Sequence, residues 1–187
     1  MKNLIQSIHS KIQLSPTLKQ AIESKFVRKD FSKSHTLLQE HQYCRQLYFL
    51  EKGVVRTYYF HNEKDVSSWF YHEGQFFTSW YSFFSQQPSF ENIETLEDTI
   101  IYSIDYFTYQ KLLEEFPKLE RFGRLLAEEQ TSGIDLFSKG YMFMSAREKY
   151  DLLLQMFPDV TLRVNLGHIA SFLGITQETL SRIRKKK

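Results

Sequence analysis

The segment LGHIASFLGITQETLSRIR, residues 166–184, carries the pattern from which the architecture of the whole chain can be worked out. Ala170 stands four residues before Gly174, and large apolar residues flank both. The apolar set comprises Ile169, Leu173, Ile175, Leu180 and Ile183. Two helices that cross at about 90–120° over a short turn need a small residue at the crossing and a turn residue that tolerates positive φ. The spacing therefore predicts a helix-turn-helix unit.

The second helix of this unit is expected to begin after Thr176, whose hydroxyl can cap it. Leu180 and Ile183 then face inwards, which leaves polar side chains on the other surfaces. These are Gln177, Glu178, Ser181, Arg182 and Lys185. In the major groove of DNA, arginine bonds guanine, glutamine bonds adenine and glutamate accepts from cytosine. We therefore expect this helix to read the edges of DNA bases.

Positive charge gathers in the same part of the chain. Residues 145–187 contain eight Lys or Arg and four Asp or Glu, whereas the whole chain has a net charge of only +2. This skew indicates a polyanionic partner, although a tail of lysines can equally serve as a solubilising terminus. Contacts to phosphate position a protein on DNA without specifying the sequence. The phosphate contacts that we expect are Thr176, Ser181, Arg184, Lys185, Lys186 and Lys187.

Upstream of residue 145 the sequence changes from helical to strand periodicity and back. The first thirty residues predict short helices, with a capping hydroxyl and a proline at Ser15-Pro16 as a start signal. From about Thr36, aromatic and β-branched runs separated by turn residues predict an antiparallel roll or barrel and an α+β fold. The expected strands are Gln46–Leu50, Val54–Phe60, Val66–Tyr71, Asn92–Leu96 and Thr99–Ile104.

A long helix is expected over residues 118–144, after Pro117, followed by a helix that Ser145 caps. Apolar and small residues recur along the long helix at three- and four-residue steps. They are Leu119, Phe122, Leu126, Gly133, Leu136, Gly140 and Phe143. Such a seam can pack against its own copy in a second subunit, or it can cover a face of the roll. We expect residues 1–117 to form a sensor roll, 118–144 a dimerisation helix and 145–187 a helix-turn-helix domain.

These stretches together resemble the Crp/Fnr (catabolite activator) family of bacterial regulators. The segment 174–184, GITQETLSRIR, is similar to the recognition helix of the family, and 47–55, LYFLEKGVV, resembles a strand–turn–strand of its roll. The resemblance covers nearly the whole chain. It implies a cyclic-nucleotide-binding-like jelly roll and a homodimer on double-stranded DNA, with base contacts at Gln177, Glu178 and Arg182 and RNA polymerase as a further partner.

Two departures from the family pattern accompany this resemblance. The chain stops at Lys187 without the β-hairpin wing of many relatives, so either this subfamily lacks the wing or the chain is truncated. In the ligand cradle, members that bind cyclic AMP present a Gly-Glu pair and then an Arg-Ser pair. Thr78-Ser79 and Ser89-Phe90 stand at these positions. Loss of the only cation would leave a buried phosphate unpaired, so we expect no response to cyclic AMP.

The dense aromatic residues near the cradle leave two alternatives open. They can line an apolar pocket for another small-molecule effector, or they can fill a core among themselves. These residues are Trp69, Phe70, Tyr71, Phe76, Phe77, Trp80, Tyr81, Phe83 and Phe84.

Composition argues against several other classes of protein. No run approaches the eighteen or so apolar residues of a membrane span, and Met1–Leu14 is too polar for a signal peptide, so we expect a cytoplasmic protein without a membrane partner. The single cysteine, Cys44, excludes an internal disulfide and a four-thiolate metal site. His35, His41, His61 and His72 with Glu73 lack ligand spacing, so we expect no metal, cofactor or catalysis.

One alternative to a DNA-binding regulator remains. The roll could sense or scaffold through protein–protein contacts, and the helix-turn-helix would then serve as a protein-binding surface without specific DNA binding.

Overall fold

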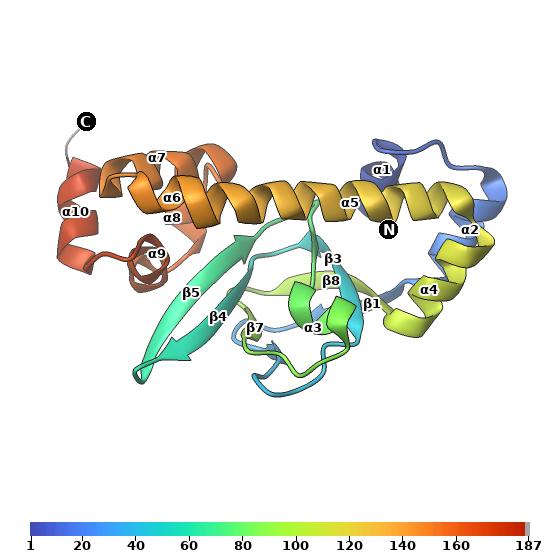
Figure 1. The fold of residues 1–187 in the computed structure, drawn as a ribbon, viewed down its shortest axis with the longest axis horizontal. Coiled ribbons are helices and arrows are strands. Elements are labelled where there is room, and N and C mark those ends of the chain that lie inside the picture. Colours follow the sequence, from blue (N-terminus) through green and yellow to red (C-terminus); the bar gives the residue numbers. More distant parts are fainter. Residues whose placement is uncertain (186–187) are drawn as a thin grey trace.

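The computed structural model describes residues 1–185, in which a roll of two β-sheets lies under one long helix (Figure 1). Two helices precede the roll, α1 (Lys2–His9) and α2 (Pro16–Lys25). Ser15 Oγ accepts the Leu18 N–H at 3.1 Å, as its cap position predicts. The prediction of helices throughout the first thirty residues is wrong at its end, because Val27–Phe31 is a strand that pairs with a later one.

Each sheet has four strands and all the strand pairs are antiparallel. One sheet has the order β1-β8-β3-β6 and the other β2-β7-β4-β5. Their bounds are β1 Val27–Phe31, β2 Thr36–Leu38, β3 Gln46–Lys52, β4 Val55–His61, β5 Lys64–Tyr71, β6 Phe76–Phe77, β7 Asn92–Thr95 and β8 Thr99–Asp105. The five predicted strands are confirmed. The sequence missed β1, which is largely exposed and polar, and β2 and β6, which have only three and two residues.

The turn between β3 and β4 requires a glycine. Gly53 has φ +108°, and a Cβ there would lie 3.0 Å from the Thr99 Cα and closer still to the Thr99 hydroxyl. Its N–H donates to Glu73 Oε1 at 2.7 Å. The Lys52-Gly53 turn signal in the sequence therefore marks a close approach of three segments of the roll.

Besides α1 and α2, further helices share a core with the roll. They are α3 (Trp80–Ser85), α4 (Tyr106–Glu115) and the first half of α5 (Pro117–Asp135). Asp105 caps α4 by accepting the Thr108 N–H at 3.1 Å. Phe49 of β3 and Phe122 of α5 are fully buried in this core.

The long helix continues from α5 through a π-helical turn at Leu136–Gly140 into α6 (Tyr141–Phe143). Leu119, Phe122 and Leu126 of α5 are buried against the roll, so the first half of the predicted dimer seam is wrong and covers a face of the roll instead. The second half differs, because large apolar side chains there are exposed. They are Ile134, Leu136, Met142 and Phe143.

Four short helices complete the described chain: α7 (Ala146–Met156), α8 (Val160–Arg163), α9 (Leu166–Leu173) and α10 (Gln177–Lys185). Ser145 and Glu148 form a capping box at the start of α7, with the Ser145 N–H donating to Glu148 Oε2 at 2.7 Å. The unit has its own core, which Phe70 and Val54 of the roll join. Among residues 1–185 no helix is long and apolar enough to span a membrane.

Candidate nucleic-acid interface and ligand cavity

The turn between α9 and α10 has the geometry that the sequence predicts. Gly174 adopts φ +68°, and the Ile175 N–H donates back to the Ala170 carbonyl at 3.0 Å. A glycine ends a helix in this left-handed conformation without the steric cost of a Cβ. Thr176 then accepts the Thr179 N–H at 3.2 Å on its hydroxyl and so caps α10.

Buried apolar side chains hold α10 against the rest of the unit. Ile169 and Leu180 have no exposed surface, and Ala170 is buried in the same core. The Arg147 guanidinium at the start of α7 donates to the Ile183 carbonyl at 3.2 Å, near the end of α10. Contacts near the start and near the end of α10 therefore hold the helix in place, and its polar face points away from the core.

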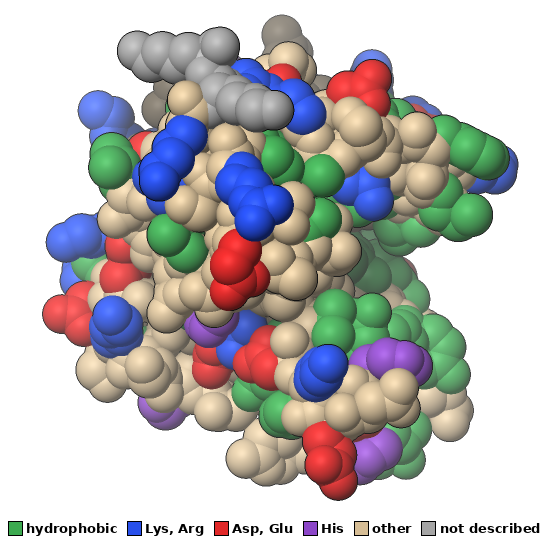
Figure 2. Space-filling model, turned by 90° about the vertical axis from the view of Figure 1, so that its left-hand side faces the viewer, with side chains coloured by type: hydrophobic (Ala, Val, Ile, Leu, Met, Phe, Trp, Pro, Cys, Tyr) green, Lys and Arg blue, Asp and Glu red, His purple; other side chains and the backbone are tan. Residues whose placement is uncertain are grey.

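The side chains predicted to meet DNA lie on that outer side. Gln177, Glu178 and Arg182, the predicted base contacts, are all exposed. The predicted phosphate contacts Thr176, Ser181, Arg184 and Lys185 are exposed too, whereas Lys186 and Lys187 lie outside the described residues. Figure 2 views this end of the molecule, where Lys and Arg side chains gather in the upper part and acidic side chains and histidines lie below.

Local hydrogen bonds keep the acidic member of this set ionised. The N–H of Glu178 itself and the Thr176 hydroxyl lower the pKa of the Glu178 carboxyl, and the charge of Arg182 adds to this effect. Gln177 lies over the start of α9, because a Cβ at Gly167 would be only 3.0 Å from Gln177 Nε2. The α10 surface thus offers an acceptor, a cation and an amide side by side.

An ion-pair cluster fastens the C-terminal unit to the roll. Arg163 of α8 donates to both carboxylate oxygens of Glu73, at 2.7 and 2.9 Å, and also to Glu97. Burial opposes ionisation of Glu73, but the hydrogen bonds from Arg163 and from the Gly53 N–H outweigh it and lower the pKa of Glu73 to about 2. Sequence reasoning missed this cluster, because its members lie far apart in the chain.

A second attachment joins α9 to strand β5. The Ser67 N–H donates to Ser171 Oγ at 3.1 Å, and the rings of Phe70 and Phe172 pack 5.3 Å apart. The Phe172 ring also meets those of Trp69 and Phe137, each at 6.0 Å. The roll, the long helix and α9 therefore share one aromatic cluster.

The cradle positions contain short hydroxyl side chains instead of charged ones. Thr78, Ser79 and Ser89 are buried, and the Ser79 and Ser89 hydroxyls are hydrogen-bonded at 3.0 Å. Thr78 donates to the Gln46 carbonyl at 2.8 Å. Phe90, at 57% exposure, packs its ring against Tyr81 instead of joining them. The structure thus brings three of the four predicted positions together and leaves Phe90 at the surface.

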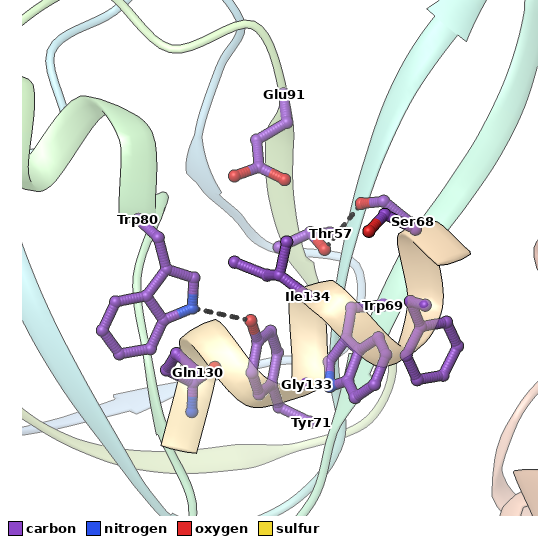
Figure 3. Close-up of a pocket in the computed structure, with 11 residues that line it drawn as sticks. Thr57, Ser68, Trp69, Tyr71, Trp80, Glu91, Gln130, Gly133 and Ile134 are labelled. Carbon is purple, nitrogen blue, oxygen red and sulfur yellow. Dashed lines mark hydrogen bonds between the residues drawn. The ribbon is translucent and has the colours of Figure 1, made fainter. Parts of the chain in front are cut away.

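A cavity of about 430 Å³ lies beside the cradle, between the roll and the long helix (Figure 3). Of the aromatic residues noted in the sequence, Trp69, Tyr71 and Trp80 line this cavity. Four others, Phe70, Phe76, Phe77 and Phe83, are buried in the cores. Part of the aromatic cluster therefore lines a cavity and part fills the cores, while the binding of an effector in the cavity stays a prediction.

Sequence reasoning missed Glu91, which is the one charged side chain among the described residues of the cavity wall. Figure 3 shows its carboxylate pointing towards the space between Trp80, Thr57 and Ile134. Burial raises the pKa of Glu91, and hydrogen bonds from Ser79 and Ser68 oppose the rise only in part. Nothing in the sequence around Glu91 distinguishes it from a loop residue. Within residues 1–185 no group of His, Cys, Asp or Glu side chains is arranged to hold a metal ion.

Proteins of known family and known structure resemble this chain. Residues 28–116 match the family model of the cyclic nucleotide-binding domain. A CooA mutant from Carboxydothermus hydrogenoformans aligns over 95% of this chain and 80% of its own, with a TM-score of 0.69 at 21% identity. The catabolite activator protein of Thermus thermophilus aligns over 95% and 84%, with a TM-score of 0.62 at 18% identity.

A third structure carries the family name itself. It is a proposed transcriptional regulator of the crp/fnr family from Eubacterium rectale, aligned over 91% of this chain and 82% of its own, with a TM-score of 0.68 at 18% identity. The chain has the Crp/Fnr fold. Among the curated proteins, no match to the sequence is found. The resemblance predicted from residues 47–55 and 174–184 is confirmed, and so is the α+β fold with its jelly roll.

The wall of the cavity beside the cradle carries an acidic side chain, Glu91, and no basic one among the described residues. A cyclic nucleotide brings a negative phosphate, which this wall would repel. Both the absence of the arginine from the cradle and the presence of Glu91 in the cavity wall therefore oppose the binding of cyclic AMP.

Proposed function

We propose that this protein is a sequence-specific, DNA-binding transcription regulator without enzymatic activity, and that it acts as a homodimer in the cytoplasm. The observation that carries the proposal is the α10 surface, on which Gln177, Glu178 and Arg182 are exposed while Leu180 anchors the helix. A helix held in this way can enter the major groove with its polar side first. The basic end of the chain supplies the attraction to phosphate.

Dimerisation is supported by the exposed apolar side chains near the end of the long helix. Met142 and Phe143 are 73% and 87% exposed, and Ile134 and Leu136 are exposed about two turns earlier. A cluster of large exposed apolar side chains on one helix marks a surface for a partner. A two-fold pair would set two α10 helices in successive major grooves, about 34 Å apart. We propose residues 1–117 as the sensing part, the exposed second half of the helix over 118–144 as the dimerising part and 145–187 as the DNA-reading part.

Selection of bound duplexes from a random library tests the DNA-reading proposal. We expect a near-palindromic site, and an affinity that falls steeply between low and physiological salt. Arg182→Ala should lose about 1–3 kcal/mol of discrimination at one base position, since it removes a bidentate contact to guanine. Arg28→Ala, which removes one exposed positive charge on β1, is the matched control and should keep the site preference.

Two results would overturn the proposal. Duplex binding without salt dependence is one, and an Arg182→Ala variant with unchanged affinity and preference is the other. Either would favour a roll that works through protein contacts alone. RNA polymerase is a further proposed partner, and its recruitment to the selected duplex in a transcription assay tests that contact separately.

Sedimentation of the full chain tests the dimer. Phe143→Glu would place a charge in the proposed interface, so we expect it to produce monomers at concentrations where the parent protein is dimeric. Lys19→Glu, on the exposed side of α2, is the control and should stay dimeric. A monomeric parent protein would refute the dimer without touching the assignment of the α10 surface.

A further inference from the structure

The cavity beside the cradle has the size and lining of a small-molecule site. Its volume of about 430 Å³ lies within the range of about 300–1,000 Å³ that is typical of ligand pockets. Trp69, Tyr71 and Trp80 supply aromatic walls, and Gln130 to Ser138 of the long helix supply the facing wall. The Trp80 indole N–H donates to the Tyr71 hydroxyl at 3.2 Å, which holds two of the rings in place (Figure 3).

The negative charge of the cavity wall favours a positively charged ligand. The Glu91 carboxylate is partly buried, and in the described part of the chain no Lys or Arg forms an ion pair with it. A desolvated carboxylate without a counter-ion is costly, and a cation that enters beside it offsets that cost. Aromatic faces attract the same kind of ion through their quadrupoles.

We propose that this cavity binds a small organic ammonium ion, whose charge pairs with Glu91 and whose apolar body packs against Trp69, Tyr71 and Trp80. Ser79 and Ser68 are polar neighbours of the carboxylate. The Ser68 hydroxyl donates its hydrogen to the Thr57 hydroxyl at 2.8 Å, and Thr57 is a further polar group in the wall. This proposal names the effector class of the regulator and in that respect rests on the proposed function, although binding itself does not require DNA.

The long helix offers a route from this cavity to the DNA-reading unit. Phe137 and Ser138 line the cavity and belong to the π-helical turn, a feature that often marks functional sites. The Phe137 ring lies 4.5 Å from that of Trp69 and 6.0 Å from that of Phe172 on α9. A ligand that displaces Trp69 or Phe137 therefore acts directly on the packing of α9, and a bound state can favour one placement of α10.

Calorimetry on the full chain, without DNA, tests the proposal with 2-phenylethylamine as the probe. We expect the amine to bind about tenfold or more tightly than its neutral analogue 2-phenylethanol, since hydrogen bonds between charged groups are stronger than those between neutral groups. Glu91→Gln should weaken the affinity for the amine by about the same factor and leave the affinity for the alcohol unchanged. Glu115→Gln, at an exposed site on α4, is the matched control and should change neither affinity.

The pH dependence gives a second readout. Because burial raises the pKa of Glu91, its carboxylate takes up a proton at a higher pH than an exposed glutamate does. On acidification, the affinity for the amine should therefore begin to fall at a higher pH than it would beside an exposed glutamate. Glu91→Gln should remove this dependence, and its circular dichroism should match that of the parent because the change is nearly isosteric.

Equal affinity for amine and alcohol, or a Glu91→Gln variant that binds the amine as well as the parent, would overturn the proposal. So would tight binding of cyclic AMP to the parent protein, or no binding of any probe because a second copy of the chain fills the cavity. Duplex selection is a separate experiment, so a failure of the ligand proposal can be distinguished from a failure of the DNA-binding proposal.

Discussion

Replacing Arg163 by glutamine should remove the ion pairs that hold the C-terminal unit against the roll. Arg163 is only 19% exposed and donates to Glu73 and Glu97, which belong to two different loops of the roll. Each carboxylate is about one-third exposed, so solvent screens each pair in part. Charge-assisted hydrogen bonds contribute about 1.5–3 kcal/mol each when buried, and we therefore expect a loss of about 2–3 kcal/mol in unfolding free energy after this discount.

The loss should depend on pH in a defined direction. The folded-state pKa of Glu73 is lowered from 4.5 to about 2, so the stability that Glu73 contributes is fully present above about pH 5. It is lost as the pH falls from 4.5 through about 2, where the folded protein also binds the proton. The difference between the parent and the Arg163→Gln variant should therefore shrink over this range.

Urea denaturation followed by circular dichroism measures both effects. Arg124→Gln serves as the matched control, since Arg124 forms an exposed pair with Glu128 on α5 and should cost less than about 1 kcal/mol. If the two variants lose the same stability at pH 7, the Arg163 cluster does not fasten the unit to the roll. A second, earlier unfolding transition in Arg163→Gln alone would show the C-terminal unit separating first.

Three further substitutions probe other parts of the fold by the same denaturation assay. Ser145→Ala breaks the capping box of α7 and should cost about 0.5–2 kcal/mol, while Ser24→Ala at the exposed end of α2 should cost less. Gly174→Ala forces a side chain into φ +68° and should cost about 1–2 kcal/mol, with an unchanged stability speaking against the turn geometry. Arg56→Met leaves the Asp65 and Glu94 carboxylates without their partner, so a loss of about 3–5 kcal/mol is expected and a neutral result would contradict the buried pairing.

Local rules were enough to predict most elements of secondary structure. The Ser15, Ser145 and Thr176 caps act within three residues, so sequence spacing alone locates the helix starts. The Gly174 turn is equally local, because its positive φ depends on the residue itself. Aromatic and β-branched runs likewise indicated strands β3, β4, β5, β7 and β8. Strands β1, β2 and β6 escaped detection because pairing with a distant strand, and not their own sequence, makes them strands.

Part of the candidate sites also followed from sequence. The positions of Gln177, Glu178 and Arg182 on the outer side of α10 come from helical periodicity once Leu180 faces inwards. The packing partner of the long helix could not be predicted from sequence. Periodicity shows that Leu119, Phe122 and Leu126 share a face, but it does not show which part of the protein covers that face. Only the packed roll decided that this half of the seam lies within the subunit.

The chain by itself thus determined its caps, its turns and the polar side of its last helix, since each depends on residues within one or two helical turns. Tertiary structure alone decided where charges separated in sequence would meet. Arg163 finds Glu73 some 90 residues away, and Glu91 comes to lie opposite Ile134 across a cavity. Such meetings depend on how sheets and helices pack, which no local pattern of residues encodes.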